Sequence, residues 1–211
     1  MKKPLKSQKF RDLYKNLIFI RDMRTVSIIK NGYGIDVGDD EGILAYGYIN
    51  ELGELAFSIM TTVKFVDGAA VFNDEVTKRK LKHKIKIGDV ENLESEILEI
   101  DPDYLQRFLP HAMEINKQYI TSYELETVRA NEQLDNFRHF DNPDDLEAFV
   151  YHSDTNRLEG LWVRSKSMTK SGINAIVLTP VSSIFGIELG DEIEFQLYEI
   201  NAGIRLMKIV K

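Results

Sequence analysis

The stretch Gly186-Ile-Glu-Leu-Gly-Asp191, which leads into Glu192-Ile-Glu-Phe-Gln-Leu197, is a tight link followed by a β-strand candidate. It belongs to a series of short strand candidates that fills the last third of the chain. Short strands at this spacing are typical of a small barrel or a strongly bent sheet. The expected strands cover residues 146–151, 161–166, 173–179, 192–197 and 204–210.

The N-terminal third combines one expected helix with further strand candidates. Apolar residues recur at three- and four-residue steps over 7–22, and Ser7 suits the N-cap, so we expect a helix there. Residues 25–30 are β-branched and end at Asn31-Gly32, a strong hairpin signal. An antiparallel meander is expected to continue through residues 43–49, 55–65 and 69–72.

Lysines alternate with mostly apolar residues between positions 80 and 87, which predicts a strand with a lysine ladder on one face. A row of ammonium groups binds phosphates, so nucleic-acid binding is one alternative function. The other interpretation is an exposed sheet edge whose charges discourage aggregation. The net charge of -7 and the scarcity of stacking side chains beside the ladder weigh against nucleic acid. The ladder consists of Lys80, Lys82, Lys84 and Lys86.

The middle of the chain has helix signals. Asp101-Pro102 is a typical helix start, and Pro110 is expected to break or restart that helix. Thr121 and Glu124 have the spacing of a capping box, which predicts a helix to about residue 137. Asn142-Pro-Asp-Asp145 then reads as a turn or boundary.

These elements predict an α+β fold with an N-terminal helix and antiparallel β-sheet, a helical middle segment and a C-terminal small β-barrel-like domain. The corresponding regions are an N-terminal α+β region at 1–100, a helical connector at 101–140 and a C-terminal small β-domain at 141–211. Whether the two β-rich regions share one core stays open at this point.

Composition and charge narrow the function classes. The 211 residues include no cysteine, which excludes disulfides and cysteine-rich zinc sites and is compatible with a cytoplasmic setting. No apolar run reaches the length of a membrane span or a secretory signal, so we expect no membrane association. Residues 1–30 are strongly basic and residues 88–160 strongly acidic, an asymmetry that steers association with a charged partner.

Signatures of common enzymes are missing from the sequence. It contains no Gly-x-Ser-x-Gly elbow, no His-Glu-x-x-His and no phosphate-binding loop. The glycines at 32, 34 and 38 do not fit a dinucleotide-binding pattern, and the histidine spacings match no metal motif. We therefore expect no cofactor, no metal and no assigned catalytic residue, and the sequence leans against an enzyme.

A small set of residues stands out as a binding candidate. His139 lies in Arg138-His-Phe-Asp141, near further carboxylates, where the alternatives are a base or ligand and a solvated turn. Trp162 and Arg164 share a face if their segment is a strand, and Arg beside Trp can clamp an anion or a partner's carboxylate. Convergence on a small anionic ligand, in a binder or an enzyme, would involve Arg129, Arg138, His139 and Arg164.

The C-terminal region resembles a family known from Gram-positive bacteria whose function is unknown. The resemblance rests on Arg129, on Leu134-Asp-Asn-Phe-Arg138 with Asn142-Pro-Asp-Asp145, on Glu159-Gly-Leu-Trp-Val-Arg164 and on Gly186 to Ile193. It covers the last 80 residues or so and implies a small domain, some of whose relatives neighbour toxin–immunity or stress genes. Leu178-Thr-Pro180 stands where those relatives carry Asn-Glu-Pro, so the carboxylate of that motif is absent from this chain.

The function expected from these observations is that of a bacterial cytoplasmic, non-enzymatic protein-interaction protein of the immunity type. Its acidic middle and the Trp162/Arg164 face would contact a basic protein partner, because complementary charge gives fast and specific association. A small-anion binder or enzyme, and a nucleic-acid binder, are the alternatives.

Overall fold

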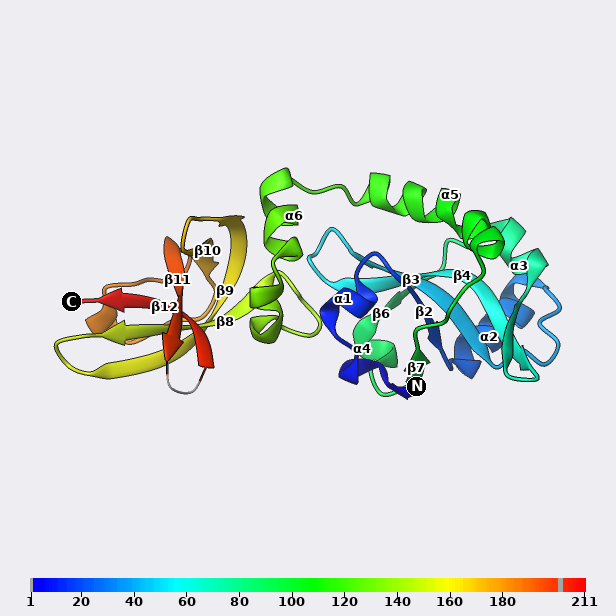
Figure 1. Ribbon diagram of the computed structural model, residues 1–211, viewed down its shortest axis with the longest axis horizontal. Helices are drawn as coiled ribbons and strands as arrows, with labels where there is room; N and C mark the ends of the chain where they lie inside the picture. Colours follow the sequence, from blue (N-terminus) through cyan, green and yellow to red (C-terminus); the bar gives the residue numbers. More distant parts are fainter. Residues whose placement is uncertain (1, 201–202) are drawn as a thin grey trace. The chain divides into compact units, whose positions relative to one another are not determined.

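The computed structural model describes residues 2–200 and 203–211, and the chain divides into two compact units, residues 1–120 and 121–211 (Figure 1). Each unit has its own hydrophobic core and mixes helix with strand. Within the described residues, no helix has the length and apolar character needed to cross a membrane.

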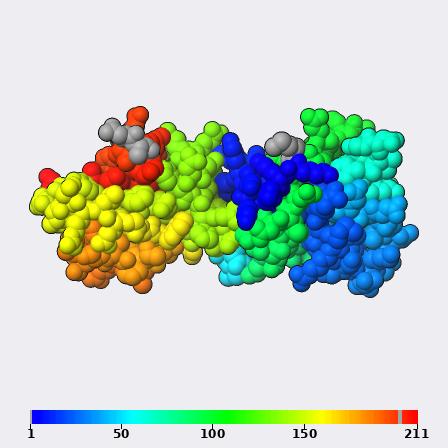
Figure 2. All heavy atoms as spheres, turned by 90° about the horizontal axis from the view of Figure 1, so that it is seen from below, coloured from blue at the N-terminus to red at the C-terminus, as the bar shows by residue number. Residues whose placement is uncertain are grey.

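The N-terminal unit is a mostly antiparallel sheet with helices around it. Its strands run in the order β1-β7-β2-β3-β4-β5, and β6 pairs with β4 beside this path. The N-terminal residues, dark blue in Figure 2, lie on the surface of this unit, where Lys3 pairs with Ser95. The strands are β1 (Lys3–Pro4), β2 (Leu17–Ile20), β3 (Gly42–Ile49), β4 (Leu55–Val66), β5 (Ala69–Phe72), β6 (Lys84–Lys86) and β7 (Glu94–Glu96). The helices are η1 (Leu5–Ser7), α1 (Phe10–Leu13), α2 (Met23–Tyr33), α3 (Asp74–Arg79), α4 (Ile87–Val90) and α5 (Pro102–Gln118).

Helix α5 covers one face of this sheet. Its residues Phe108, Ala112 and Ile115 are buried against a cluster that includes Phe19 and Leu44. Asp101 caps its first turn by accepting a hydrogen bond from the Asp103 amide. The helix continues through Pro110, so the expected break does not occur and the helix forgoes only a local backbone hydrogen bond there.

The helix expected over 7–22 is wrong. Residues 10–13 alone form α1, Lys15 adopts a positive φ of 57°, and β2 follows and pairs with β3. Ile18, Phe19 and Ile20 are each 0% exposed. A strand in the middle of a sheet is buried on both faces, so its sequence is continuously apolar and does not alternate. The apolar residues 17–20 therefore matched the helical spacing of the residues before them.

The strand and hairpin expected at 25–32 are also wrong, because this segment is helix α2. The Asp22 side chain accepts a hydrogen bond from the Thr25 amide at 3.1 Å, and Gly34 ends the helix at φ 63°. Val26 and Ile29, three residues apart, bury one face. By contrast, the strands expected at 43–49, 55–65 and 69–72 are confirmed as β3, β4 and β5.

The C-terminal unit is built on a closed barrel in the order β10-β11-β12-β8-β9. Neighbouring strands are antiparallel except that the last, β12, pairs in parallel with the first, β8. The small β-barrel expected here is confirmed, and each expected strand is present. The strands are β8 (Asp145–His152), β9 (Arg157–Met168), β10 (Gly172–Val177), β11 (Glu192–Ile200) and β12 (Gly203–Val210), with the short helix η3 (Ser183–Phe185).

Two helices precede the barrel and pack on its core. α6 (Tyr123–Ala130) begins at Ser122, whose hydroxyl accepts from the Leu125 amide, and η2 (Glu132–Phe137) follows after Asn131. Val128, Leu134 and Phe137 are buried in the barrel core. The segment expected to be a helical connector at 101–140 is thus divided, since α5 belongs to the first unit and α6 with η2 to the second.

Candidate functional site

The predicted binding residues of the C-terminal unit gather around the segment 142–145. Arg129, at the end of α6, is 5% exposed and holds Asp144 through two hydrogen bonds, Nε to Oδ1 at 2.9 Å and Nη2 to Oδ2 at 2.7 Å. Its Nη1 also donates to Glu126 at 3.2 Å. The guanidinium therefore ties α6 to the start of the barrel.

Arg138 is the most deeply buried of these side chains, with 2% of it exposed. It donates to the backbone carbonyls of Pro143 and Val128 at 2.8 Å each, and to the Asp135 carboxylate at 3.2 Å. These bonds link the end of α6, η2 and the turn before β8. They direct the guanidinium to internal carbonyls.

His139, in the turn before β8, and Trp162, on β9, lie next to each other. Their rings meet edge to face, with centroids 5.1 Å apart. His139 Nδ1 accepts hydrogen bonds from the amides of Asp141 and Asn142, at 3.2 and 3.3 Å, which makes it the acceptor that shapes this turn. Trp162 is half-buried.

Arg164 projects from β9 next to β8. It forms a bidentate pair with Asp145, at 2.7 and 3.0 Å, and 47% of its side chain is exposed. The hydrogen bonds to Asp145 raise the pKa of Arg164 further above its ordinary value. The predicted residues thus do converge, but Arg129, Arg138 and Arg164 direct their donors to Asp144, Asp145 and backbone carbonyls.

The lysine ladder does not form as expected. Lys80 ends α3 with a positive φ of 47°, and β6 holds Lys84 and Lys86 only, so the four side chains do not share one strand face. Lys80 pairs with Glu114 at 2.7 Å, Lys86 pairs with Glu54 at 3.0 Å, and Lys84 donates to the Tyr119 hydroxyl.

Two of these lysines lower the pKa of the glutamate that each contacts. The hydrogen bond from Lys80 lowers the pKa of Glu114, and bonds from Asn50 and Lys86 lower the pKa of Glu54. Glu114 lies in α5 and Tyr119 caps its C-terminal end. Lys80 and Lys84 therefore fasten the end of α3 and strand β6 to that helix.

A pocket that the sequence did not point to lies in the N-terminal unit. Its volume is about 530 Å³. The β4–β5 hairpin, the extended segment after β7 and the first turn of α5 form its walls. We call it the acidic pocket, and its lining includes Phe65, Phe72, Tyr104, Glu96, Ile97, Glu99 and Asp101.

Three aromatic side chains, Phe65, Phe72 and Tyr104, line the acidic pocket. Phe72 packs against Tyr104 with centroids 5.2 Å apart, and against Phe108 at 5.5 Å. Two cations of the chain already lie over rings of this pocket. The Lys2 ammonium lies 5.1 Å from the Phe65 centroid, and the Arg107 guanidinium lies 4.6 Å from that of Tyr104.

The segment 97–101 provides the acidic rim. Leu98 and Ile100 turn inward onto the core that α5 covers, whereas Ile97 is 51% exposed and Glu99 is also exposed. This alternation leaves Ile97 and Glu99 exposed in the lining that they share with the aromatic side chains. The sequence shows that this region is acidic, but its place beside Phe65 and Phe72 depends on the β4–β5 hairpin, which is about 30 residues away in sequence.

Within residues 2–200 and 203–211, no group of three His, Asp or Glu side chains is arranged to hold a metal ion. Comparison with family models, with curated proteins and with solved structures found no match. The resemblance to a Gram-positive bacterial family stays a prediction.

Proposed function

We propose that the protein is a non-enzymatic, cytoplasmic interaction protein of bacteria, of the immunity type, that binds a basic protein partner. The observation that carries this proposal is the acidic pocket, which is lined by Glu96, Glu99 and Asp101 together with three aromatic side chains. A lysine or arginine side chain of the partner would place its charge among these groups.

The chemistry of the acidic pocket suits such a side chain. A cation over an aromatic ring gains about 0.5–1 kcal/mol at an exposed site and more when water is excluded. Lys2 and Arg107 make such contacts with Phe65 and Tyr104, so a partner's cation would take the place of one of them or contact Phe72. The exposed Ile97 offers apolar surface to the methylene stem of a partner's lysine or arginine.

Charge on a larger scale supports the same partner. The chain carries a net charge of -7, and residues 88–160 are its most acidic part. Complementary fields raise association rates and discriminate against partners of the wrong sign.

The two alternative functions gain less support. The lysines proposed for nucleic acid include three that are paired with Glu114, Tyr119 and Glu54. The arginines proposed for an anionic ligand are engaged with Asp144, Asp145 and backbone carbonyls. A polyanion would have to break these contacts.

The test uses the Glu99→Lys variant and the matched control Glu188→Lys, an exposed position of the other unit with the same charge change. Each purified chain is titrated with a fluorescent oligoarginine peptide at low and high salt. We expect Glu99→Lys to weaken binding about tenfold, equivalent to about 1.4 kcal/mol, and the control to have a much smaller effect. Nuclease-treated pull-downs with the three chains should show one partner that Glu99→Lys alone loses. Equal losses in both variants would overturn the proposal, because they would reflect net charge and not this pocket.

A further inference from the structure

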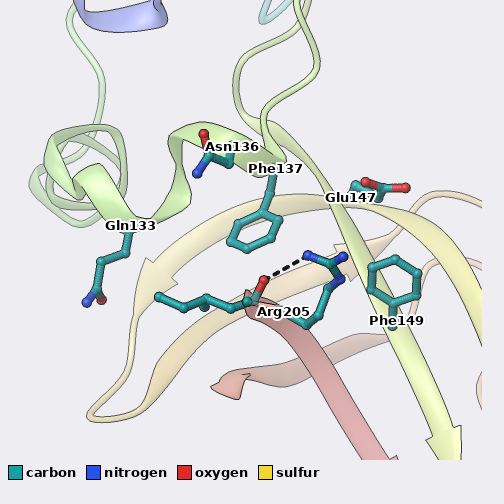
Figure 3. Close-up of a pocket in the computed structure, with 8 residues that line it drawn as sticks. Gln133, Asn136, Phe137, Glu147, Phe149 and Arg205 are labelled. Carbon is teal, nitrogen blue, oxygen red and sulfur yellow. Dashed lines mark hydrogen bonds between the residues drawn. The ribbon is translucent and has the colours of Figure 1, made fainter. Parts of the chain in front are cut away.

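A second pocket lies on the outside of the barrel unit, with a volume of about 540 Å³ (Figure 3). This size lies within the range of small-molecule sites. Residues of η2 and of the neighbouring strands β8 and β12 line it: Gln133, Asn136, Phe137, Glu147, Phe149 and Arg205. We call it the barrel pocket.

Strand pairing brings opposite charges together at this pocket. In the parallel pair of β8 and β12, Phe149 is level with Met207. Two residues earlier on each strand, and on the same face, are Glu147 and Arg205. Neighbouring strands lie about 4.8 Å apart, so the two side chains start side by side.

These two charges do not neutralise each other. In the part of the chain that the structure describes, the Arg205 guanidinium makes one polar contact, a hydrogen bond from Nη1 to the Ile204 carbonyl at 3.1 Å. The side-chain carboxylate of Glu147 forms no hydrogen bond or ion pair with the described residues. Figure 3 shows the guanidinium pointing between the rings of Phe137 and Phe149, and its centre lies 6.0 Å from the Phe149 centroid. Donors of Arg205 are therefore left for a ligand.

The contrast with three other arginines of this unit is informative. Arg129 and Arg164 each form bidentate bonds to a carboxylate, and Arg138 holds backbone carbonyls. Those three have structural partners, whereas Arg205 faces a cavity beside an unpaired carboxylate and aromatic rings. The side chains of Gln133 and Asn136 at the rim add further donors and acceptors without a partner among the described residues.

We propose that the barrel pocket binds a free α-amino acid with an apolar or aromatic side chain. The ligand's carboxylate lies on Arg205, where a fork of N–H donors matches it, and its ammonium lies on Glu147. Its side chain packs on Phe149, next to the mostly buried Phe137 that lines the same pocket. Opposite charges on adjacent strands match a zwitterion, whose two charged groups share one carbon atom.

Other ligand classes fit less well. A phosphate group would meet one arginine and the like-charged Glu147. The C-terminus of a peptide would supply the carboxylate but no ammonium for Glu147. The site lies in a different unit from the acidic pocket and does not depend on the proposed protein partner.

The test is calorimetric titration of the full chain with phenylalanine, leucine, methionine and tryptophan. N-acetylphenylalanine, which lacks the ammonium, and phenylalanine amide, which lacks the carboxylate, serve as paired probes, and AMP tests a phosphate ligand. We expect saturable binding of at least one apolar amino acid, reduced at least about tenfold for both modified probes.

Variants assign each charge to its partner. Arg205→Gln should bind phenylalanine and its amide equally, and Glu147→Gln should bind phenylalanine and its N-acetyl derivative equally. Arg157→Gln, an exposed arginine of the same barrel outside the pocket lining, is the control and should bind as the unmodified chain does. Absence of saturable binding by all four amino acids, preference for AMP, or equal binding of the modified probes by the unmodified chain would overturn the proposal.

Discussion

The two units of the chain use their charged side chains differently. In the barrel unit, Arg129 and Arg138 are almost completely buried and hold helices to strands. In the sheet unit, pairs such as Arg107 with Asp74 lie at the surface, with 48% and 58% of the side chains exposed. The barrel unit thus uses two arginines as internal fasteners beside exposed pairs such as Lys166 with Glu192, whereas the pairs described for the sheet unit lie nearer the surface.

This difference separates structural charge from charge that remains available for binding. A buried ion pair is costly to break because a charge is left without water or partner, whereas an exposed pair contributes little. Residue type alone selects buried structural charges, such as Arg129 and Arg138. The barrel pocket instead contains Arg205 and Glu147, which form no ion pair among the described residues.

The largest effect is expected for Arg129→Ala, which leaves Asp144 buried without its cation. Breaking a buried pair costs about 3–5 kcal/mol. Trp162 is the one tryptophan of the sequence and lies in the barrel, so its fluorescence during urea unfolding reports on that unit. The double variant Arg129→Ala/Asp144→Ala should recover part of the loss. A cost below about 1 kcal/mol would show that the pair is not a fastener.

A smaller loss is expected for Arg138→Ala, which deprives the carbonyls of Pro143 and Val128 of their donor. An unsatisfied buried polar group costs about 1–3 kcal/mol. The same fluorescence measurement applies. Arg138→Lys should retain part of the stability only, because one ammonium cannot reproduce the planar fork of donors; full rescue by lysine would contradict this account.

Arg107→Ala tests the opposite side of the comparison. Its exposed pair with Asp74 is expected to contribute about 0–1 kcal/mol. Amide hydrogen exchange of β3 and β4, measured by mass spectrometry, follows the sheet unit separately from the barrel. A loss as large as that of Arg129→Ala would remove the distinction between the units.

The smallest expected effect is a pH dependence from His111 of α5. Burial lowers its pKa below the ordinary value, while Glu114 opposes and Lys80 adds to this shift. The folded state therefore binds the proton less well than the unfolded state, and stability declines as pH falls through about 6.5, until it levels off below the folded pKa. Protection factors of the sheet-unit amides, which are exchange rates corrected for the intrinsic rate at each pH, measure this slope between pH 5 and pH 8. His111→Gln should reduce it, and an unchanged slope would assign it to other groups.

The fold was predictable where local signals act alone. The barrel strands are short and separated by turn residues, so Leu161 to Lys166 and Glu192 to Leu197 were recognised. Leu17 to Ile20 was not, because it is buried on both faces and follows a short helix with a similar apolar pattern. Asn31-Gly32 indicated a hairpin, but Asp22 and Gly34 cap a helix around it.

The candidate sites depend on contacts across the sequence. Convergence of Arg129, Arg138, His139 and Arg164 on an anionic ligand is one alternative that the sequence leaves open, and the sequence does not assign Asp144 and Asp145 as internal partners. The barrel pocket requires a parallel register between β8 and β12, and the acidic pocket requires the hairpin to meet the segment after β7. Neither contact can be predicted from residue spacing, because each joins segments that are distant in the sequence.

The parallel closure of the barrel also sets when it can form during synthesis. Its first strand, β8, waits for its partner until residues 203–210 have left the ribosome, while the sheet unit is complete much earlier. Until then β8 and β11 each present an unpaired edge, the kind of surface on which nascent chains associate wrongly. A ribosome that stalls before β12 would release a chain with a finished sheet unit and an open barrel, a substrate for chaperones and proteases.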